Sequence, residues 1–342
     1  MATPPEVVAV VVNWNGARHL TECLDSLLAQ RPRPPSRIVV IDNGSTDGSR
    51  EVIAGYGPAL TPIYNDRNRG FAEGSNQGIR LGGGELVALL NNDAVAAPGW
   101  LAALVAALER HPQAGSCTSR ILSYADRDVV DNVGHVLFRD GLTRGRGRLE
   151  RDAGQYDREE EVFCASGCAC LLRRRMLDDV GLFDESFFAY CEDADLGFRA
   201  RLRGWSAVYA PDAVAYHRFS ASTETFSPLK ALNVERNRAW LAVKNLPLPL
   251  LAASLPHTLH RYLWQAWGAL TARGASGRFV ATRSAGELAL LLLRAHREAL
   301  AGLPGAWRQR RIIQRGRKAT RAEIRSWFRS FGVGAREIAL ME

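Results

Sequence analysis

Residues 86–100 read LVALLNNDAVAAPGW, an apolar run that leads directly into two amides and a carboxylate, Asn91, Asn92 and Asp93. One explanation is a helix cap, because Asn and Asp side chains accept hydrogen bonds from the free N–H groups at the start of a helix. The other explanation is a buried strand that delivers polar groups to a binding site. The pattern of the neighbouring segments distinguishes the two.

Two earlier segments also run from apolar into polar residues. They are EVVAVVVNWNG (6–16) and SRIVVIDNGSTDGS (36–49), and their polar ends contain Asn13, Asn15, Asp42 and Asn43. Continuous apolar runs are typical of strands buried on both faces of a parallel sheet, and the leucines of residues 17–30 have helical spacing. This alternation predicts an α/β layer fold, in which ligands bind beyond the carboxyl ends of the strands. Three polar clusters at one such edge favour a ligand site over three independent caps.

Other nucleotide-binding α/β classes lack their signatures here. The turn after the first apolar run, NWNGARHL, has one glycine in place of the G-x-G-x-x-G fingerprint, and the phosphate-loop pattern is absent. Further along, NDRNRGFAEGSNQGIRLGGGE (65–85) places Asn68, Gly70, Asn76 and Gly78 among small residues. Small residues would let the backbone approach a ligand closely. A simple turn followed by a helix start is the alternative.

The cysteines and the N-terminus bear on the cellular setting. With 46% hydrophobic and 23% charged residues, the 342-residue chain has ordinary globular composition, enough for one large or two smaller domains. Cys164, Cys168 and Cys170 could be metal ligands, but their apolar run, VFCASGCACLL, favours small buried hydrophobes. The start, MATPPE, has no basic segment followed by an apolar one, so we expect no signal peptide and a cytoplasmic location.

An acidic cluster marks a later helix. In CEDADLGFRARLRG (191–204) the residues Glu192, Asp193 and Asp195 crowd the start of a predicted amphipathic helix. Acids stabilise a helix N-terminus, but three are more than a cap needs. The glycine-rich and charged segment at 131–161 precedes this helix. It can be interpreted equally as the acceptor side of an active site or as a solvated insertion.

Six segments of this sequence together resemble a known family. It is similar to family 2 glycosyltransferases with the GT-A fold, and most of all to the bacterial rhamnosyltransferase branch. The resembling segments, between residues 7 and 223, are VVVNWNG, VVIDNGSTDGS, NRGFAEGSNQGI, LLNNDAVAAPGWL, VGLFDESFFAYCEDADLGFRARLRGW and YHRFSAST. The resemblance implies a Rossmann-like, mostly parallel sheet flanked by helices over residues 1–225, and a helical, basic C-terminal region over residues 226–342.

The resemblance also implies roles for the matching residues. NND stands in the place of the family's D-x-D motif, so Asp93 would bind a Mg2+ or Mn2+ ion that bridges the donor phosphates. The first acid of that motif is Asn91 here, a departure that leaves one charged ligand. His217 stands where the family often has a second metal ligand, although a structural histidine is the alternative. In CEDAD, Asp193 would be the catalytic base, with Glu192 beside it. The implied donor-binding residues are Asn13, Asn15, Asp42, Asn43, Asn68, Gly70, Asn76, Asn91 and Asn92.

The activity implied is an inverting, metal-dependent sugar transfer. The best match is transfer of L-rhamnose from dTDP-L-rhamnose to a saccharide or lipid-linked saccharide in cell-envelope polysaccharide synthesis. The alternatives are a transferase that uses another UDP- or GDP-sugar, and an inactive nucleotide- or carbohydrate-binding module with a membrane-docking tail.

The C-terminal region carries the excess positive charge. From Arg294 to Arg336 there are eleven Arg and one Lys against two Glu, a net of +10, so the rest of the chain sums to −2 of the total +8. In RKATRAEIRSWFRSFG (317–332) the apolar residues share one helical face, as in interfacial membrane helices. These are Ile324, Trp327, Phe328 and Phe331.

This tail has three interpretations. We expect it to hold the enzyme at the inner face of the cell membrane, because a lipid-linked acceptor is the more coherent partner. The alternatives are a helix packed on the catalytic domain and a nucleic-acid surface, and we expect no nucleic acid. The apolar segments near Pro247, Pro249 and Pro256 are too interrupted to predict a membrane-spanning helix.

Overall fold

The computed structural model describes residues 5–218 and 227–341, which group into two compact units. The N-terminal unit lies within residues 1–134, 145–189 and 205–223. The C-terminal unit lies within residues 135–144, 190–204 and 224–342, and therefore contains the acidic segment CEDAD. The boundary expected at residue 225 and the last five residues of the YHRFSAST segment are outside the described residues.

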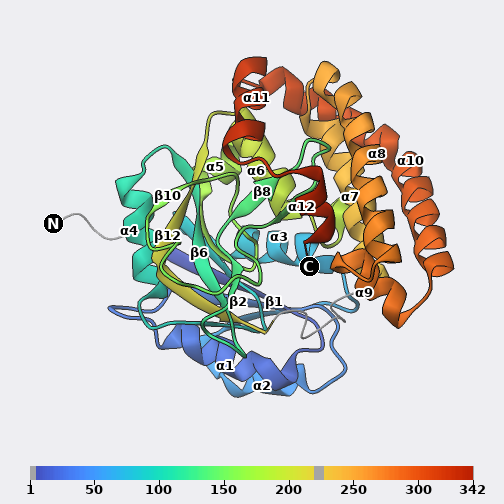
Figure 1. The fold of residues 1–342 in the computed structure, drawn as a ribbon. Helices are drawn as coiled ribbons and strands as arrows, with labels where there is room; N and C mark the ends of the chain where they lie inside the picture. Colours follow the sequence, from blue (N-terminus) through green and yellow to red (C-terminus); the bar gives the residue numbers. More distant parts are fainter. Residues whose placement is uncertain (1–4, 219–226, 342) are drawn as a thin grey trace. The chain divides into compact units, whose positions relative to one another are not determined.

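The N-terminal unit is built on a sheet whose first half is parallel. Strands lie in the order β3-β2-β1-β4, and every neighbouring pair among them is parallel. Their bounds are Val7–Asn13 (β1), Arg37–Asp42 (β2), Thr61–Tyr64 (β3) and Leu86–Leu90 (β4). The intervening helices are α1 (Ala17–Leu28), α2 (Ser49–Gly55) and α3 (Gly70–Gly82). Figure 1 shows α1 and α2 on one side of β1 and β2 and α3 on the other. The predicted alternation of buried strands and helices is confirmed.

The second half of the sheet is mixed. It contains β5 (Ala94–Ala96), β6 (Ala114–Ser123), β7 (Val130–Asn132), β10 (Glu160–Val162), β11 (Ala169–Arg173) and β12 (Ser206–His217). Strand β11 is antiparallel to β4 and β6, while β12 runs parallel to β6 and antiparallel to β5 and β10. Helices α4 (Trp100–Arg110) and α5 (Arg174–Val180) belong to this half. The antiparallel strands need no helical crossovers, so they appear where the strand–helix alternation of the sequence stops.

Helix α3 lies unusually close to the sheet because of a row of glycines. Gly74, Gly78 and Gly82 are four residues apart and therefore share one face of the helix. An added Cβ at these positions would come within 2.9, 2.4 and 2.4 Å of valine side chains of β1. The interpretation of Gly78 as a point of close approach to a ligand is therefore wrong, because this glycine faces β1.

The C-terminal unit is helical, as predicted. Its elements are β8 (His135–Leu137), α6 (Glu192–Leu202), α7 (Pro228–Asn245), α8 (Leu248–Leu270), α9 (Gly274–Thr282), α10 (Ala285–Gly316), α11 (Arg321–Ser330) and α12 (Ala335–Leu340). Helix α8 continues through Pro256, one of the prolines that interrupt the apolar segments of this region. A proline removes one helical hydrogen bond, and the helix tolerates that loss here. Among the described residues, no helix is both long and apolar enough to cross a bilayer.

The aromatic face of the tail points inward. Ile324 on α11 is fully buried, and the ring of Trp327 meets that of Phe198 on α6 edge-on at 6.0 Å. The guanidinium of Arg201 lies 4.5 Å from the ring centre of Phe331. The prediction that this face contacts lipid is wrong for Ile324 and Trp327. An apolar helical stripe has the same pattern whether it faces a protein core or a membrane, and here it faces the core.

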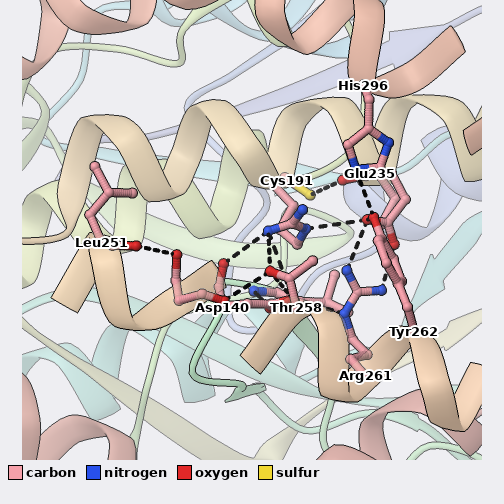
Figure 2. Close-up of polar contacts among 12 residues, drawn as sticks. Asp140, Cys191, Glu235, Leu251, Thr258, Arg261, Tyr262 and His296 are labelled. Atoms are coloured by element: carbon pink, nitrogen blue, oxygen red, sulfur yellow. Dashed lines mark hydrogen bonds and ion pairs between the residues drawn. The ribbon is translucent and has the colours of Figure 1, made fainter. Parts of the chain in front are cut away.

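A buried ionic network joins α7 and α8 to the turn after β8 (Figure 2). Arg261 on α8 is completely buried, and its guanidinium donates to Asp140 at 2.8 Å and to Glu235 at 2.6 and 2.9 Å. The hydroxyl of Tyr262 also donates to Glu235, at 2.9 Å. Burial opposes the charge of Glu235, but Arg261 and Arg238 hold its pKa far below the usual range. The network keeps four charged side chains paired inside the unit.

The glycine row leads to a stability prediction. Gly78→Ala should lower the free energy of unfolding by about 1–3 kcal/mol, because the added methyl overpacks the contact with Val10. Gly55→Ala in α2 is the matched control, since its Cβ would meet nothing within 4 Å. That substitution should be neutral or stabilising by up to about 1 kcal/mol through helix propensity. Urea unfolding followed by circular dichroism measures both, and equal stability of the two variants would contradict the close packing.

Candidate active site

The pairing of β12 with β5 brings Asp93 and His217 together. His217 lies opposite Ala94, the residue after Asp93, and the N–H of Arg218 donates to the carbonyl oxygen of Asp93 at 3.0 Å. As a result, Nε2 of His217 lies 3.2 Å from Oδ1 of Asp93, with both side chains about nine-tenths buried. The two residues that the resemblance assigned to the metal are therefore neighbours in the structure.

Asp131 on β7 orients the imidazole from its other side. Its Oδ2 lies 2.6 Å from Nδ1 of His217, and its other oxygen is paired with Arg148. Burial acts to lower the pKa of His217, but Cys168, Asp131 and Asp93 together raise it well above its usual value. His217 thus lies between two carboxylates, and both favour its protonated form. Sequence reasoning missed Asp131, whose only signal was its place in the segment interpreted as acceptor side or insertion.

The Asp93–His217 pair suits a hard or borderline divalent cation. Oδ1 of Asp93 is buried and accepts no hydrogen bond of good geometry from the described residues. A carboxylate oxygen beside an imidazole nitrogen is a donor set that Mg2+ or Mn2+ can use. No three His, Cys, Asp or Glu side chains within residues 5–218 and 227–341 converge as a metal cluster. If a cation binds here, Asp93 and His217 would contact it, and substrate phosphates and water would supply further oxygens, as is usual for Mg2+.

Polar residues at three strand ends form one buried network. Asn92, after β4, donates to Oδ1 of Asn13 at the end of β1, at 2.7 Å. The amide of Asn13 lies 3.3 Å from Oδ1 of Asp42 at the end of β2. Side chains of Asn13 and Asp42 are completely buried. The polar clusters of the three strands therefore meet at one edge of the sheet, as their order in the sequence predicted.

The loops after β1 and β2 are tied to each other. Oδ1 of Asn15 accepts from the N–H of Thr46 at 2.9 Å, and Asn15 has a left-handed backbone with φ of 49°. Asp42 accepts from Nε of Arg50 at 3.0 Å. Arg50 is about half exposed, so it covers the carboxylate that the resemblance assigned to the nucleoside. A ligand would reach Asp42 by replacing this arginine.

The other residues that the resemblance assigned to the donor form hydrogen bonds at α3 and at its N-terminal end. Asn68 accepts from the N–H of Gly70 at 2.8 Å, and the amide of Asn43 donates to the carbonyl oxygen of Gly70 at 3.0 Å. Gly70 has φ of 82°, a conformation that favours glycine. Asn76 uses its amide on the backbone of Phe183, at 2.8 and 3.0 Å. Asn76 therefore positions a neighbouring segment.

Asn91, the first residue of the NND motif, is held through its backbone. Its N–H donates to the carbonyl oxygen of Cys168 at 2.8 Å, and its own carbonyl accepts from Ala94 at 3.0 Å and from the thiol of Cys23 at 3.3 Å. These bonds form the tight corner between β4 and β5. The corner sets where Asp93 leaves the sheet.

In the C-terminal unit the three acids of CEDAD have different environments. Asp195 is completely buried and contacts Nζ of Lys244 at 2.9 Å, Nε of Arg199 at 2.8 Å and the amide of Asn245 at 2.8 Å. Burial acts to raise its pKa, but Lys244 and Arg199 hold the value below the usual range. Asp195 therefore has a structural role as the negatively charged partner of Lys244 and Arg199.

Glu192 is buried without such compensation. Its Oε2 has no hydrogen-bond partner among the described residues. Burial and the charges of Asp193 and Asp195 raise the pKa of Glu192 well above its usual value. These surroundings favour the protonated form of Glu192, and a protonated carboxyl cannot act as a general base.

Asp193 is the most accessible carboxylate of the three, with 19% of its side chain exposed. Its Oδ1 accepts from the N–H of Ala194 at 2.7 Å, and Nε2 of His135 on β8 lies 3.8 Å from its Oδ2. The preceding residues Tyr190 and Cys191 have left-handed backbones with φ of 73° and 68°. Strained backbone of this kind is common where a functional side chain must be aimed. Sequence reasoning missed His135, because it lies in a glycine-rich segment with no periodic pattern.

The chain matches a family of sugar-transferring enzymes. The model for glycosyl transferase family 2 matches residues 8–181, just over half of the chain. The chain belongs to this family. A relative, the N-acetylglucosaminyl-diphospho-decaprenol L-rhamnosyltransferase of Mycobacterium tuberculosis, is 31% identical over 236 residues, which cover 63% of this chain and 76% of that protein. Family membership supports a role in sugar transfer.

Solved structures extend the likeness to the fold. The mannosyltransferase PcManGT from Pyrobaculum calidifontis, in complex with GDP-Man and Mn2+, has a TM-score of 0.53 and 18% identity, covering 92% of this chain and 86% of that one. GalNAc-T7 with UDP, GalNAc and Mn2+ has a TM-score of 0.53 and 17% identity, covering 62% of this chain and 43% of that one. This family 2 glycosyltransferase thus has a GT-A-like mixed α/β fold, as predicted.

The environments of the acids predict losses of stability that differ in size. Asp195→Asn should lower the free energy of unfolding by about 3–5 kcal/mol, because it leaves Lys244 and Arg199 buried without a counter-charge. Asp193→Asn, the matched change two residues earlier, should cost less than about 1 kcal/mol, because the Asp193 side chain is 19% exposed and ion pairs that reach solvent contribute little. Urea unfolding compares the two, and a loss of similar size in both variants would contradict the structural role of Asp195.

Proposed function

We propose that this protein is an inverting, metal-dependent glycosyltransferase that moves a sugar from a nucleoside diphosphate donor to a hydroxyl of a lipid-linked saccharide. The observation that carries the proposal is the Asp93–His217 pair, in which a buried carboxylate oxygen without a well-formed hydrogen bond faces an imidazole nitrogen. Asp93 of this pair follows β4, at the edge of the sheet where the polar ends of β1 and β2 also meet.

The donor side has a simple electrostatic requirement. A divalent cation, when bound, neutralises the charge that develops on the departing diphosphate. Asp93 and His217 would hold it, and Asp131 keeps the imidazole oriented. Asn92, the residue before Asp93, donates its amide to Asn13 and adds no negative charge at this edge of the sheet. The Mn2+ in the complexes of PcManGT and GalNAc-T7 supports a divalent cation here.

On the acceptor side, Asp193 is the best general base. It is the accessible member of the acidic cluster, whereas the surroundings of Glu192 favour its protonated form and Asp195 is paired with Lys244. A carboxylate that removes the proton of the attacking hydroxyl is typically worth about 10²–10⁴-fold in rate. One base and direct attack from the opposite face invert the anomeric centre, by the logic of inverting glycoside hydrolysis.

The sugar and the acceptor follow the mycobacterial relative. Its name supports L-rhamnose as the sugar and a polyprenyl diphosphate saccharide as the acceptor, so we propose dTDP-L-rhamnose as donor and a role in cell-envelope polysaccharide synthesis. Another UDP- or GDP-sugar is the alternative donor. An inactive binding module is less favoured, because Asp93 and an accessible Asp193 are both present. A polyprenyl-linked acceptor would place the enzyme at the cytoplasmic face of the membrane as a peripheral protein.

The catalytic assignment is tested with Asp193→Asn. Release of nucleoside diphosphate is measured with dTDP-L-rhamnose, UDP-sugars and GDP-sugars, with and without Mn2+. We expect Asp193→Asn to lower kcat at least about 100-fold and to leave the donor Kd unchanged, because the amide cannot accept a proton. Asp93→Asn should instead abolish the increase in donor affinity that Mn2+ produces. Normal turnover of Asp193→Asn would refute its role as base.

Cation binding should depend on pH in a defined direction. Because the pKa of His217 is raised, the imidazole must lose its proton before it can hold a metal ion, and cation binding should release a proton. Affinity for Mn2+ should therefore rise with pH from 6 to 8. Titration calorimetry in buffers of different ionisation enthalpy counts the released protons. His217→Gln should bind more weakly with no proton release, and an unchanged proton count would contradict His217 as ligand.

A further inference from the structure

Helix α8 exposes a row of leucines on one face. The exposed fractions are 58% for Leu248, 71% for Leu255, 62% for Leu259, 64% for Leu263 and 87% for Leu270. Successive members are four or seven residues apart, so they share one side of the helix. The buried residues Ser254, Arg261 and Gly268 are seven apart and form the opposite side. Single exposed leucines are ordinary on protein surfaces, but a continuous row along a helix of about 34 Å indicates a contact surface.

The charge of this helix is arranged in the reverse of the usual way. Between Leu248 and Leu270 the sequence has no Asp, Glu or Lys, and its single Arg is Arg261. Arg261 points inward to Asp140 and Glu235, as Figure 2 shows. A surface helix normally presents its charged residues to water and its apolar residues to the core. In α8 the charged group is inside and the leucines are outside.

Helix α10 has a second set of exposed apolar residues. The hydroxyl of Tyr262 on α8 lies 3.1 Å from Nε2 of His296 on α10, so the two helices meet at this point. Exposed apolar residues of α10 are Leu290, Leu293, Leu300, Trp307 and Ile312. They alternate with exposed arginines at 294, 297, 308, 311 and 315. We call the exposed leucines of α8 together with these exposed residues of α10 the leucine–arginine face.

The net charge around this face is strongly positive. From Leu248 to Gly316 the sequence contains ten Arg and two Glu, with no Asp or Lys. Arg261 and Arg310 are buried, while the other eight arginines are exposed. Of the two glutamates, Glu298 is paired with Arg294 and Arg236. An apolar row bordered by arginines is complementary to a bilayer surface that carries anionic headgroups.

We propose that the leucine–arginine face docks this protein on anionic membranes, with α8 lying in the plane of the interface. The leucines would enter the boundary between headgroups and acyl chains, and the arginines would contact lipid phosphates. A second copy of the chain fits this face less well, because self-association would bring two sets of exposed arginines together. The inference concerns a surface outside the donor and acid residues, and it holds whichever sugar is transferred.

The test uses leucine substitutions that should leave the fold unchanged. The docking variant combines Leu255→Ser, Leu259→Ser and Leu263→Ser. The control variant combines Leu81→Ser, Leu149→Ser and Leu229→Ser, three leucines that are 46%, 54% and 51% exposed elsewhere. Equal thermal unfolding of both variants and equal donor binding establish that neither site is disturbed. Full-length protein is sedimented with vesicles of phosphatidylcholine alone or mixed with phosphatidylglycerol.

We expect the wild type and the control variant to bind the phosphatidylglycerol vesicles. The docking variant should bind at least about tenfold more weakly, at low and high salt alike, because its loss is apolar. A third variant, Arg297→Gln with Arg308→Gln and Arg311→Gln, should lose binding mainly at low salt, where each arginine contributes about fivefold.

Three results would overturn the proposal. The first is absence of wild-type binding to anionic vesicles, and the second is equal binding of the docking and control variants. The third is a wild-type dimer in sedimentation equilibrium that the docking variant converts to a monomer, which would make this face a protein interface. Because vesicle binding needs no sugar transfer, failure here would leave the proposed activity standing, and loss of turnover would leave the docking result standing.

Discussion

The N-terminal unit depends on the register of its last strand, β12. Antiparallel pairing with β5 sets His217 opposite Ala94, and parallel pairing with β6, which also carries β7, brings Asp131 to the other side of the imidazole. A slip of one residue would turn His217 to the opposite face of the sheet, because side chains alternate along a strand. Strand pairing therefore determines the contact between Asp93 and His217, which are far apart in the sequence.

The acidic turn of α6 shows how environment divides the roles of similar side chains. Burial without a compensating cation raises the pKa of Glu192, whereas Lys244 and Arg199 hold the pKa of Asp195 below its usual range. Asp193, between them in the sequence, is the most accessible of the three. Pairs of acids whose surroundings push their pKa values apart are typical of acid–base sites.

The sequence was most informative where burial imposes a pattern. The apolar runs before Asn13, Asp42 and Asp93 predicted parallel strands and the edge at which their polar ends meet. Asp131 and His135 could not be found in this way, because glycine-rich, charged segments have no period. The sequence pattern also could not predict whether the aromatic face of α11 points to the core or to lipid, because the same apolar residues suit both environments. Residue roles at Asp93 and His217 came from the family resemblance, and the structure adds their proximity.

The glycine row of α3 has a mechanical consequence. Where helix and strand meet through side chains on both sides, the layer between them can adjust when one residue grows or shrinks. Here the helix contributes no side chains at Gly74, Gly78 and Gly82, so the valines of β1 support its backbone directly. A larger residue at Val10 would displace the helix as a rigid rod. Its first residue, Gly70, would move with it and carry along the corner held by Asn43 and Asn68, so a change in the core would be transmitted to the strand-end network without altering any of its residues.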